Sequence, residues 1–136
     1  MKAKLSDNFI QKYDLNLGTY YFYNQYIIAE INEGEIITLN KLNDLIPLVL
    51  KHYSNGQPFT YISDRINSHS IIPTDYLDCP LIYMDNFRGY GVVTYNKVSE
   101  MSIEVEKHFA KKPFYHFRDL KDAIEWTKKE ATKQPN

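Results

Sequence analysis

The sequence predicts an α/β domain with a mixed β-sheet and about four helices, and two observations favour this class. Between residues 57 and 130, segments of strand character alternate with segments of helical spacing, which is the pattern of right-handed crossovers and a largely parallel sheet. Ahead of them, short strand-like segments follow one another with turn residues between them, which indicates an antiparallel meander. We therefore expect a single domain over residues 1–136, with fraying from about residue 132.

The N-terminal meander is expected to contain strands at residues 9–15, 20–23 and 26–31, with turns around Gly18 and at residues 24–25. Residues 20–23 are four consecutive aromatic side chains, and neighbours in a strand point to opposite faces. Two of them are therefore expected at or near the surface. The alternatives for this aromatic edge are a contact with a second copy or another partner, and either packing as a further layer of the core or exposure without a role.

After Gly34 the apolar residues recur at helical spacing. They are Leu42, Leu45, Ile46, Val49, Leu50 and Tyr53. Thr38 and Asn43 are the alternative N-caps; the first would leave Pro47 in mid-helix and produce a kink, and the second would place it in the first turn. We expect one helix from about Thr38 with a local bend, ending near residue 55.

The second half continues with strands expected at residues 59–63, 88–95 and 114–117, and with helices near Pro73, at residues 97–109 and after Asp119. The middle helix is expected to turn one apolar stripe inward. That stripe consists of Val98, Met101, Val105 and Phe109. Asp119 is the expected N-cap of the last helix. Its inner face consists of Leu120, Ala123, Ile124 and Thr127.

Composition argues against several classes of function. The net charge is −1, so no overall field favours nucleic acid. No apolar run approaches the ~18 residues of a membrane span, and the first residues lack an apolar signal segment, so we expect a cytoplasmic protein. Cys79 is the single cysteine, which excludes an intrachain disulfide. His52, His108 and His116 lack metal-site spacing, and we expect neither a metal nor a cofactor.

A dense polar segment follows the strand at residues 59–63. It contains Asp64, Arg65, Asn67, Ser68, His69 and Ser70. The carboxyl ends of parallel strands are where open α/β sheets bind ligands, so this segment is the candidate site. The alternative is local: Asp64 and Arg65 pair with one another or with neighbours, and the other residues form the turn and the next helix cap. The chain has no Gly-x-Ser-x-Gly elbow, and we predict no catalytic residue and no enzyme.

The order of these elements resembles the STAS superfamily and, more narrowly, the bacterial SpoIIAA-like proteins with STAS/SEC14-like domains. The residues that carry the resemblance are YISDRINSHSIIPTDY (61–76), GYGVVTYN (89–96) and EKHFAKKPFYHFRDLKDAIEW (106–126). The resemblance implies a non-enzymatic regulatory module that binds an unidentified protein partner. In anti-anti-sigma members a serine of the corresponding loop is phosphorylated; the nearest equivalents are Ser68 and Ser70, in a loop without the Asp-Ser-Ser-Gly-like sequence.

The SEC14 part of the family name implies an alternative function, the binding of a small apolar, lipid-like molecule. Residues 75–87 are unusually apolar for a short helix and loop. The expected wall of such a site is formed by Leu77, Leu81, Ile82 and Met84. A carrier of this kind requires a cavity of roughly several hundred Å³ between this segment and the sheet.

Overall fold

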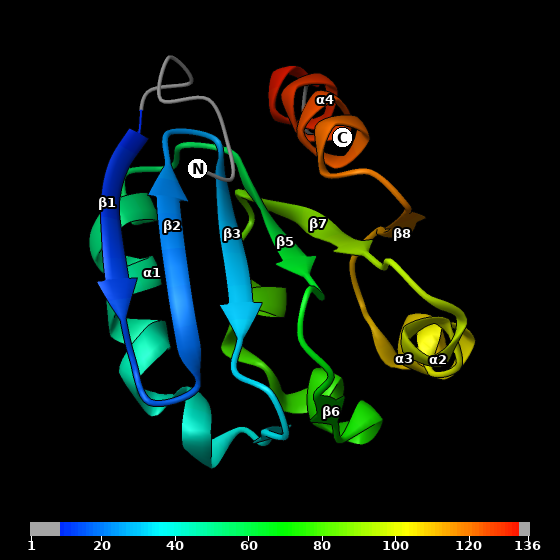
Figure 1. The fold of residues 1–136 in the computed structure, drawn as a ribbon. Helices are drawn as coiled ribbons and strands as arrows, with labels where there is room; N and C mark the ends of the chain where they lie inside the picture. Colours follow the sequence, from blue (N-terminus) through cyan, green and yellow to red (C-terminus); the bar gives the residue numbers. More distant parts are fainter. Residues whose placement is uncertain (1–8, 134–136) are drawn as a thin grey trace.

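The structure, a computed structural model, describes residues 9–133 (Figure 1). Its centre is a six-stranded sheet in the order β1-β2-β3-β5-β7-β8. The strands are β1 (Phe9–Asp14), β2 (Gly18–Tyr23), β3 (Tyr26–Ile31), β5 (Phe59–Asp64), β7 (Phe87–Val93) and β8 (Phe114–Phe117). A separate ribbon, which the sequence did not predict, pairs β4 (Ile36–Ile37) with β6 (Ser70–Ile71).

The sheet is mixed, as predicted. β1, β2 and β3 form an antiparallel meander, and β3, β5, β7 and β8 run parallel. The first hairpin is tighter than expected, because the N–H of Leu15 donates to the carbonyl of Gly18 at 2.9 Å. This bond lets β2 begin at Gly18, within the segment that was expected to form the turn.

Helical segments cover both faces of the sheet. They are η2 (Asn40–Asp44), α1 (Leu45–Tyr53), η3 (Pro73–Asp78), η4 (Pro80–Tyr83), α2 (Lys97–Glu100), α3 (Ile103–Phe109) and α4 (Leu120–Thr132), where η marks a 3₁₀ helix. In Figure 1, α1 lies behind β1–β3, while α4 lies on the other side of the sheet. Neighbouring residues of one strand enter different cores: Ile27 joins the larger one with Val49 of α1, and Ile28 joins the smaller one with Ala123 of α4.

The single helix expected from Thr38 is a wrong prediction. The chain forms the 3₁₀ helix η2 up to Asp44 and starts α1 at Leu45. Pro47 therefore lies in the first turn of α1, where a backbone N–H would have no partner within the helix. The outcome is closer to the alternative in which Asn43 was the N-cap.

The helix expected over residues 97–109 is broken, and its orientation was wrongly predicted. Asn96 caps α2 through its side-chain oxygen, which accepts from the N–H of Ser99 at 2.9 Å, and the chain breaks before α3 begins at Ile103. Of the expected inner stripe, three members are exposed: Val98 by 72%, Met101 by 79% and Val105 by 49%. Phe109 alone packs against the core. The buried residues of α3 are Ile103 and Glu106.

The exposed aromatic edge expected in the meander is not formed by β2. Tyr20 and Phe22 are buried on the side of α1. Tyr23 is buried in the other core, with its ring stacked on that of Tyr26 at a centroid distance of 4.6 Å. Only Tyr21 remains partly exposed. The reason is packing on both faces of the strand, because Tyr20 and Phe22 enter the larger core, and Tyr23 enters the smaller core with Tyr21 packed against it.

The last helix agrees with its prediction. The carboxylate of Asp119 accepts from the N–H of Lys121 at 2.8 Å, and Ala123, Ile124 and Thr127 are buried. Residues 134–136, on which most of the expected fraying falls, lie outside the described residues. Between residues 9 and 133, no helix has the length and apolar character needed to cross a membrane.

Candidate functional site

The polar segment after β5 begins inside the protein. Arg65 is only 7% exposed, and its guanidinium donates two hydrogen bonds to the carboxylate of Glu106 in α3, at 2.8 Å to Oε2 and 2.5 Å to Oε1. This is the bidentate geometry of a strong Arg–carboxylate pair. Asp64 is also buried and accepts a hydrogen bond of 2.6 Å from the hydroxyl of Tyr95. Arg65 therefore pairs with a residue 41 positions away, which sequence reasoning missed.

Hydroxyl groups complete the surroundings of this ion pair. Glu106 accepts from Tyr76 at 2.8 Å and from Ser102 at 2.5 Å, and Arg65 Nε donates to Ser63 at 3.2 Å. Burial raises the pKa of Glu106, but the hydrogen bonds and charge of Arg65, with the two hydroxyls, outweigh it and hold that pKa below its ordinary value. The network joins β5, η3 and α3 and fixes α3 against the sheet.

The next residues form a surface loop, residues 66–69, which we call the serine loop. The N–H of Ser68 donates to Glu33 Oε1 at 3.0 Å, and the side chain of Asn67 donates to the carbonyl that ends β3 at 3.1 Å. Ser68 and Ser70 are both exposed. Ser70 belongs to β6 and does not cap the following helix, since η3 has no side-chain cap.

His69 does not form a pair with either neighbouring serine. Its two ring nitrogens are shielded from solvent and make no hydrogen bond to a side chain. Burial and the charge of Arg65 lower the pKa of His69. An activated serine needs a base within hydrogen-bond reach, and this arrangement does not supply one. Among the described residues, no group of three or more His, Cys, Asp or Glu side chains is placed to hold a metal ion.

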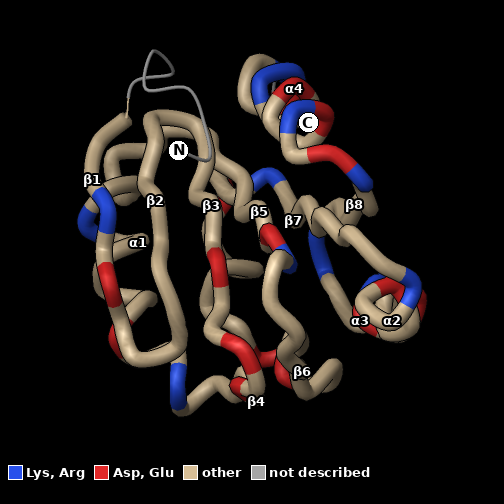
Figure 2. Tube along the Cα trace, viewed as in Figure 1, with Lys and Arg blue, Asp and Glu red and all other residues tan. Residues whose placement is uncertain are grey.

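The serine loop and α2 share one small groove of about 60 Å³, which is lined by Asn67, Ser68 and His69 on one side and by Val98, Ser99 and Ser102 on the other. Of the exposed apolar side chains in the neighbouring segments, Val98 lines this groove. Besides the stripe on α2 and α3, Ile66 is 42% exposed and Tyr95 is 51% exposed. We call Ile66, Tyr95, Val98, Met101 and Val105 the rim surface. Acidic and basic positions both occur along α2 and α3 (Figure 2).

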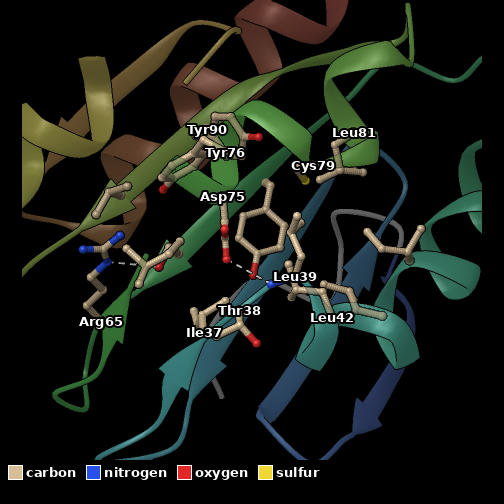
Figure 3. Close-up of a pocket in the computed structure, with 16 residues that line it drawn as sticks. Ile37, Thr38, Leu39, Leu42, Arg65, Asp75, Tyr76, Cys79, Leu81 and Tyr90 are labelled. Carbon is tan, nitrogen blue, oxygen red and sulfur yellow. Dashed lines mark hydrogen bonds between the residues drawn. The ribbon is translucent and has the colours of Figure 1, made fainter. Parts of the chain in front are cut away.

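An apolar cavity of about 60 Å³ lies on the α1 side of the sheet, beneath the 3₁₀ helices (Figure 3). Apolar side chains such as Leu42, Ile71, Leu81 and Val92 line it. The carboxylate of Asp75 accepts from the N–H of Leu39 at 3.2 Å and so joins η3 to η2 across the cavity. Of the expected apolar wall, Leu81 lines this cavity, and Leu77, Ile82 and Met84 do not.

The size of this cavity restricts what it can hold. A volume of about 60 Å³ has room for a few water molecules, whereas sites for drug-sized ligands have roughly 300–1,000 Å³. The cavity also reaches the ion pair, since Arg65 and Tyr76 form part of its wall. The thiol of Cys79 lines it as well, and burial raises the pKa of that thiol.

No protein-family model matches this sequence, and no curated protein matches it. Among solved structures, the chain is similar to the crystal structure of an uncharacterised protein of the DUF3478 family with a SpoIIAA-like fold, from Shewanella loihica PV-4. The TM-score is 0.52 at 17% identity, over 93% of this chain and 98% of that one. At this identity the likeness shows the fold alone. The fold is therefore SpoIIAA-like, as the resemblance implied.

Proposed function

We propose that this chain is a non-enzymatic regulatory module of the SpoIIAA-like class that binds another protein through the rim surface and the serine loop. The observation that carries the proposal is the orientation of α2 and α3. A surface helix ordinarily turns its apolar side inward, but here Met101 is 79% exposed while Glu106 is fully buried. Exposed apolar clusters of this kind mark interaction sites. We place the module in the cytoplasm, where the thiol of Cys79 stays reduced.

The charges beside the rim surface favour a protein partner over a membrane. Lys97 and Lys107 are balanced by Glu100 and Glu104 on the same two helices. Helices that bind anionic membranes carry a polar face rich in Lys and Arg. Mixed charge around an apolar centre is instead the composition of a protein–protein interface with a polar rim.

The ion pair supports this use of α3 because it holds the helix in place before a partner arrives. A preordered surface binds with less loss of conformational entropy than one that must first be ordered. The serine loop contributes polar contacts next to it. Glu33, which accepts from the N–H of Ser68, would repel a phosphate on that serine, so the proposal uses this loop for contact rather than for phosphorylation.

The test is a binding titration between the purified protein and purified candidates from neighbouring genes. Met101→Asp places a charge in the rim surface and is expected to weaken binding at least about tenfold. Tyr83→Asp is the matched control, because Tyr83 is 78% exposed but lies on η4, outside the rim surface; this variant should bind like the wild type. Circular dichroism of both variants confirms that they are folded.

Two results would contradict the proposal. If no candidate binds, the protein-partner function fails. If the protein floats with anionic vesicles and Met101→Asp abolishes flotation, the rim surface binds lipid and the charge argument is wrong.

A second candidate function is the binding of a small apolar molecule in the cavity, which its apolar lining favours. A lipid-like ligand would need the cavity to expand several-fold from its present 60 Å³. Native mass spectrometry of the freshly purified protein tests this function. A ligand that copurifies, and that a larger side chain at Val92 excludes, would support it; an unliganded mass alone would remove it.

A further inference from the structure

β1 stands at the outer end of the sheet, and no other strand in residues 9–133 pairs with its free edge (Figure 1). In an antiparallel ladder, the N–H and C=O groups of one residue point toward the partner strand, and those of the next residue point away from it. The bond from Leu15 to Gly18 shows that Leu15, and with it Tyr13, turns its backbone groups toward β2. The N–H and C=O groups of Lys12 and Asp14 therefore point outward, to the free edge.

The two faces of this edge differ. Lys12 and Asp14 are exposed on the side away from α1, where Asp14 Oδ1 accepts from the hydroxyl of Thr19 at 2.9 Å. Tyr13 and Leu15 are on the α1 side, pack against the larger core and are only partly buried. The edge thus combines unpaired backbone groups and one charge of each sign with core side chains that are covered incompletely.

We propose that β1 pairs antiparallel with β1 of a second copy of this chain, with Tyr13 opposite its own counterpart. In this register Lys12 lies opposite Asp14 of the second copy, and the two-fold axis repeats the pair, so two cross-strand ion pairs form. Sliding one strand by two residues, which preserves the hydrogen-bonding geometry, places either two Lys12 or two Asp14 side chains opposite each other. The charges therefore select one register.

The same features explain why the occupant is a second copy. A lysine on an edge strand ordinarily prevents pairing with other strands. Here an acidic residue follows two positions later, so β1 is complementary to itself in one register. The second copy would also cover the open sides of Tyr13 and Leu15. An irregularity between Phe9 and Gln11 limits the regular part of the edge to its second half, so we expect a small interface and weak association.

This dimer is independent of the proposed function. β1 and α2–α3 lie at opposite ends of the sheet (Figure 1). Both surfaces are therefore available together, and a dimer would present two rim surfaces. A failed search for a partner would leave the dimer untouched, and a monomeric protein would leave the rim surface untouched.

Sedimentation equilibrium from roughly 10 μM to about 1 mM covers the affinity expected of a small interface. The wild-type protein should dimerise within this range. Lys12→Asp and Asp14→Lys each place two like charges opposite one another at both cross-strand pairs, so each should weaken dimerisation about tenfold. The double variant Lys12→Asp/Asp14→Lys restores complementarity with exchanged signs and should dimerise like the wild type. An equimolar mixture of the two single variants should form heterodimers.

Three results would overturn the proposal: a wild-type monomer at the highest concentration, a dimer that both single variants retain unchanged, or single variants that do not associate when mixed. Circular dichroism shows whether each variant is folded. If Asp14→Lys does not fold because its hydrogen bond to Thr19 is lost, the dimerisation of Lys12→Asp is the deciding measurement. This variant places an aspartate opposite Asp14 of the second copy at both cross-strand pairs, and it leaves the bond between Asp14 and Thr19 intact.

Discussion

At the scale of single residues, the pair between Arg65 and Glu106 shows both the reach and the limit of sequence reasoning. The polar cluster after β5 was predicted, and the alternative interpretation paired Arg65 with Asp64 or with a neighbour. The partner was not found, because Glu106 lies 41 residues away on a helix whose apolar stripe was assigned to the inside. A buried arginine demands a carboxylate, but the sequence does not show that the arginine is buried.

Removal of one member of this pair should be strongly destabilising. Glu106→Ala leaves the guanidinium of Arg65 buried without its partner, and we expect a loss of about 3–5 kcal/mol in the free energy of unfolding. Urea denaturation measures it. Glu104→Ala is the control, because Glu104 is exposed on the same helix and its loss should stay within about 0.5 kcal/mol. Equal effects of the two variants would contradict the structure.

The same carboxylate makes stability depend on pH. The pKa of Glu106 is below its ordinary value in the folded protein, whereas a glutamate in the unfolded chain titrates near ~4.3. The stabilisation is therefore fully present above that value and is lost as pH falls through the lower folded pKa. The difference in unfolding free energy between wild type and Glu106→Gln should be constant between about pH 7 and 5 and decrease toward about pH 3. A difference that grows on acidification would show that the pKa of Glu106 is raised in the folded protein and not lowered.

At the scale of elements, strands were predicted better than helices. The strand at residues 26–31 agrees with β3 and that at 114–117 with β8, since each has a continuous run of strand-forming residues bounded by turns or proline. The helices before Tyr53 and Phe109 are interrupted, at Asp44 and after Glu100. Helical periodicity locates an apolar stripe, but it does not say whether a short helix turns that stripe to the core or to a partner.

The orientation of the segment that contains α2 and α3 has a direct consequence for stability. Ile103 is only 5% exposed, so Ile103→Ala should cost about 2–4 kcal/mol. Met101 is 79% exposed, so Met101→Ala should change stability by no more than about 0.5 kcal/mol. Chemical denaturation of both variants distinguishes the two orientations of the segment. If Met101→Ala were the more destabilising change, the orientation expected from the sequence would be correct after all.

At the scale of the whole molecule, the fold class followed from the alternation of strands and helices, because parallel pairing requires a crossover between strands. The antiparallel extension also followed, since short turns join the first strands. The interior could not be predicted in this way. The cavity is formed where η2, η3 and the sheet meet, and the bond between Leu39 and Asp75 joins segments 36 residues apart.

Whether this interior opens in solution can be measured through Cys79. Cys79 is 7% exposed and lines the cavity, and burial raises the pKa of its thiol, so both access and thiolate population are low. We expect iodoacetamide to modify it at least ~100-fold more slowly than free cysteine at the same pH, which corresponds to an opening free energy of about 2.8 kcal/mol. Modification in urea, where the chain is unfolded, provides the fast reference. A native rate within about threefold of that reference would show a cavity that opens readily, and it would strengthen the small-molecule function relative to the protein-binding one.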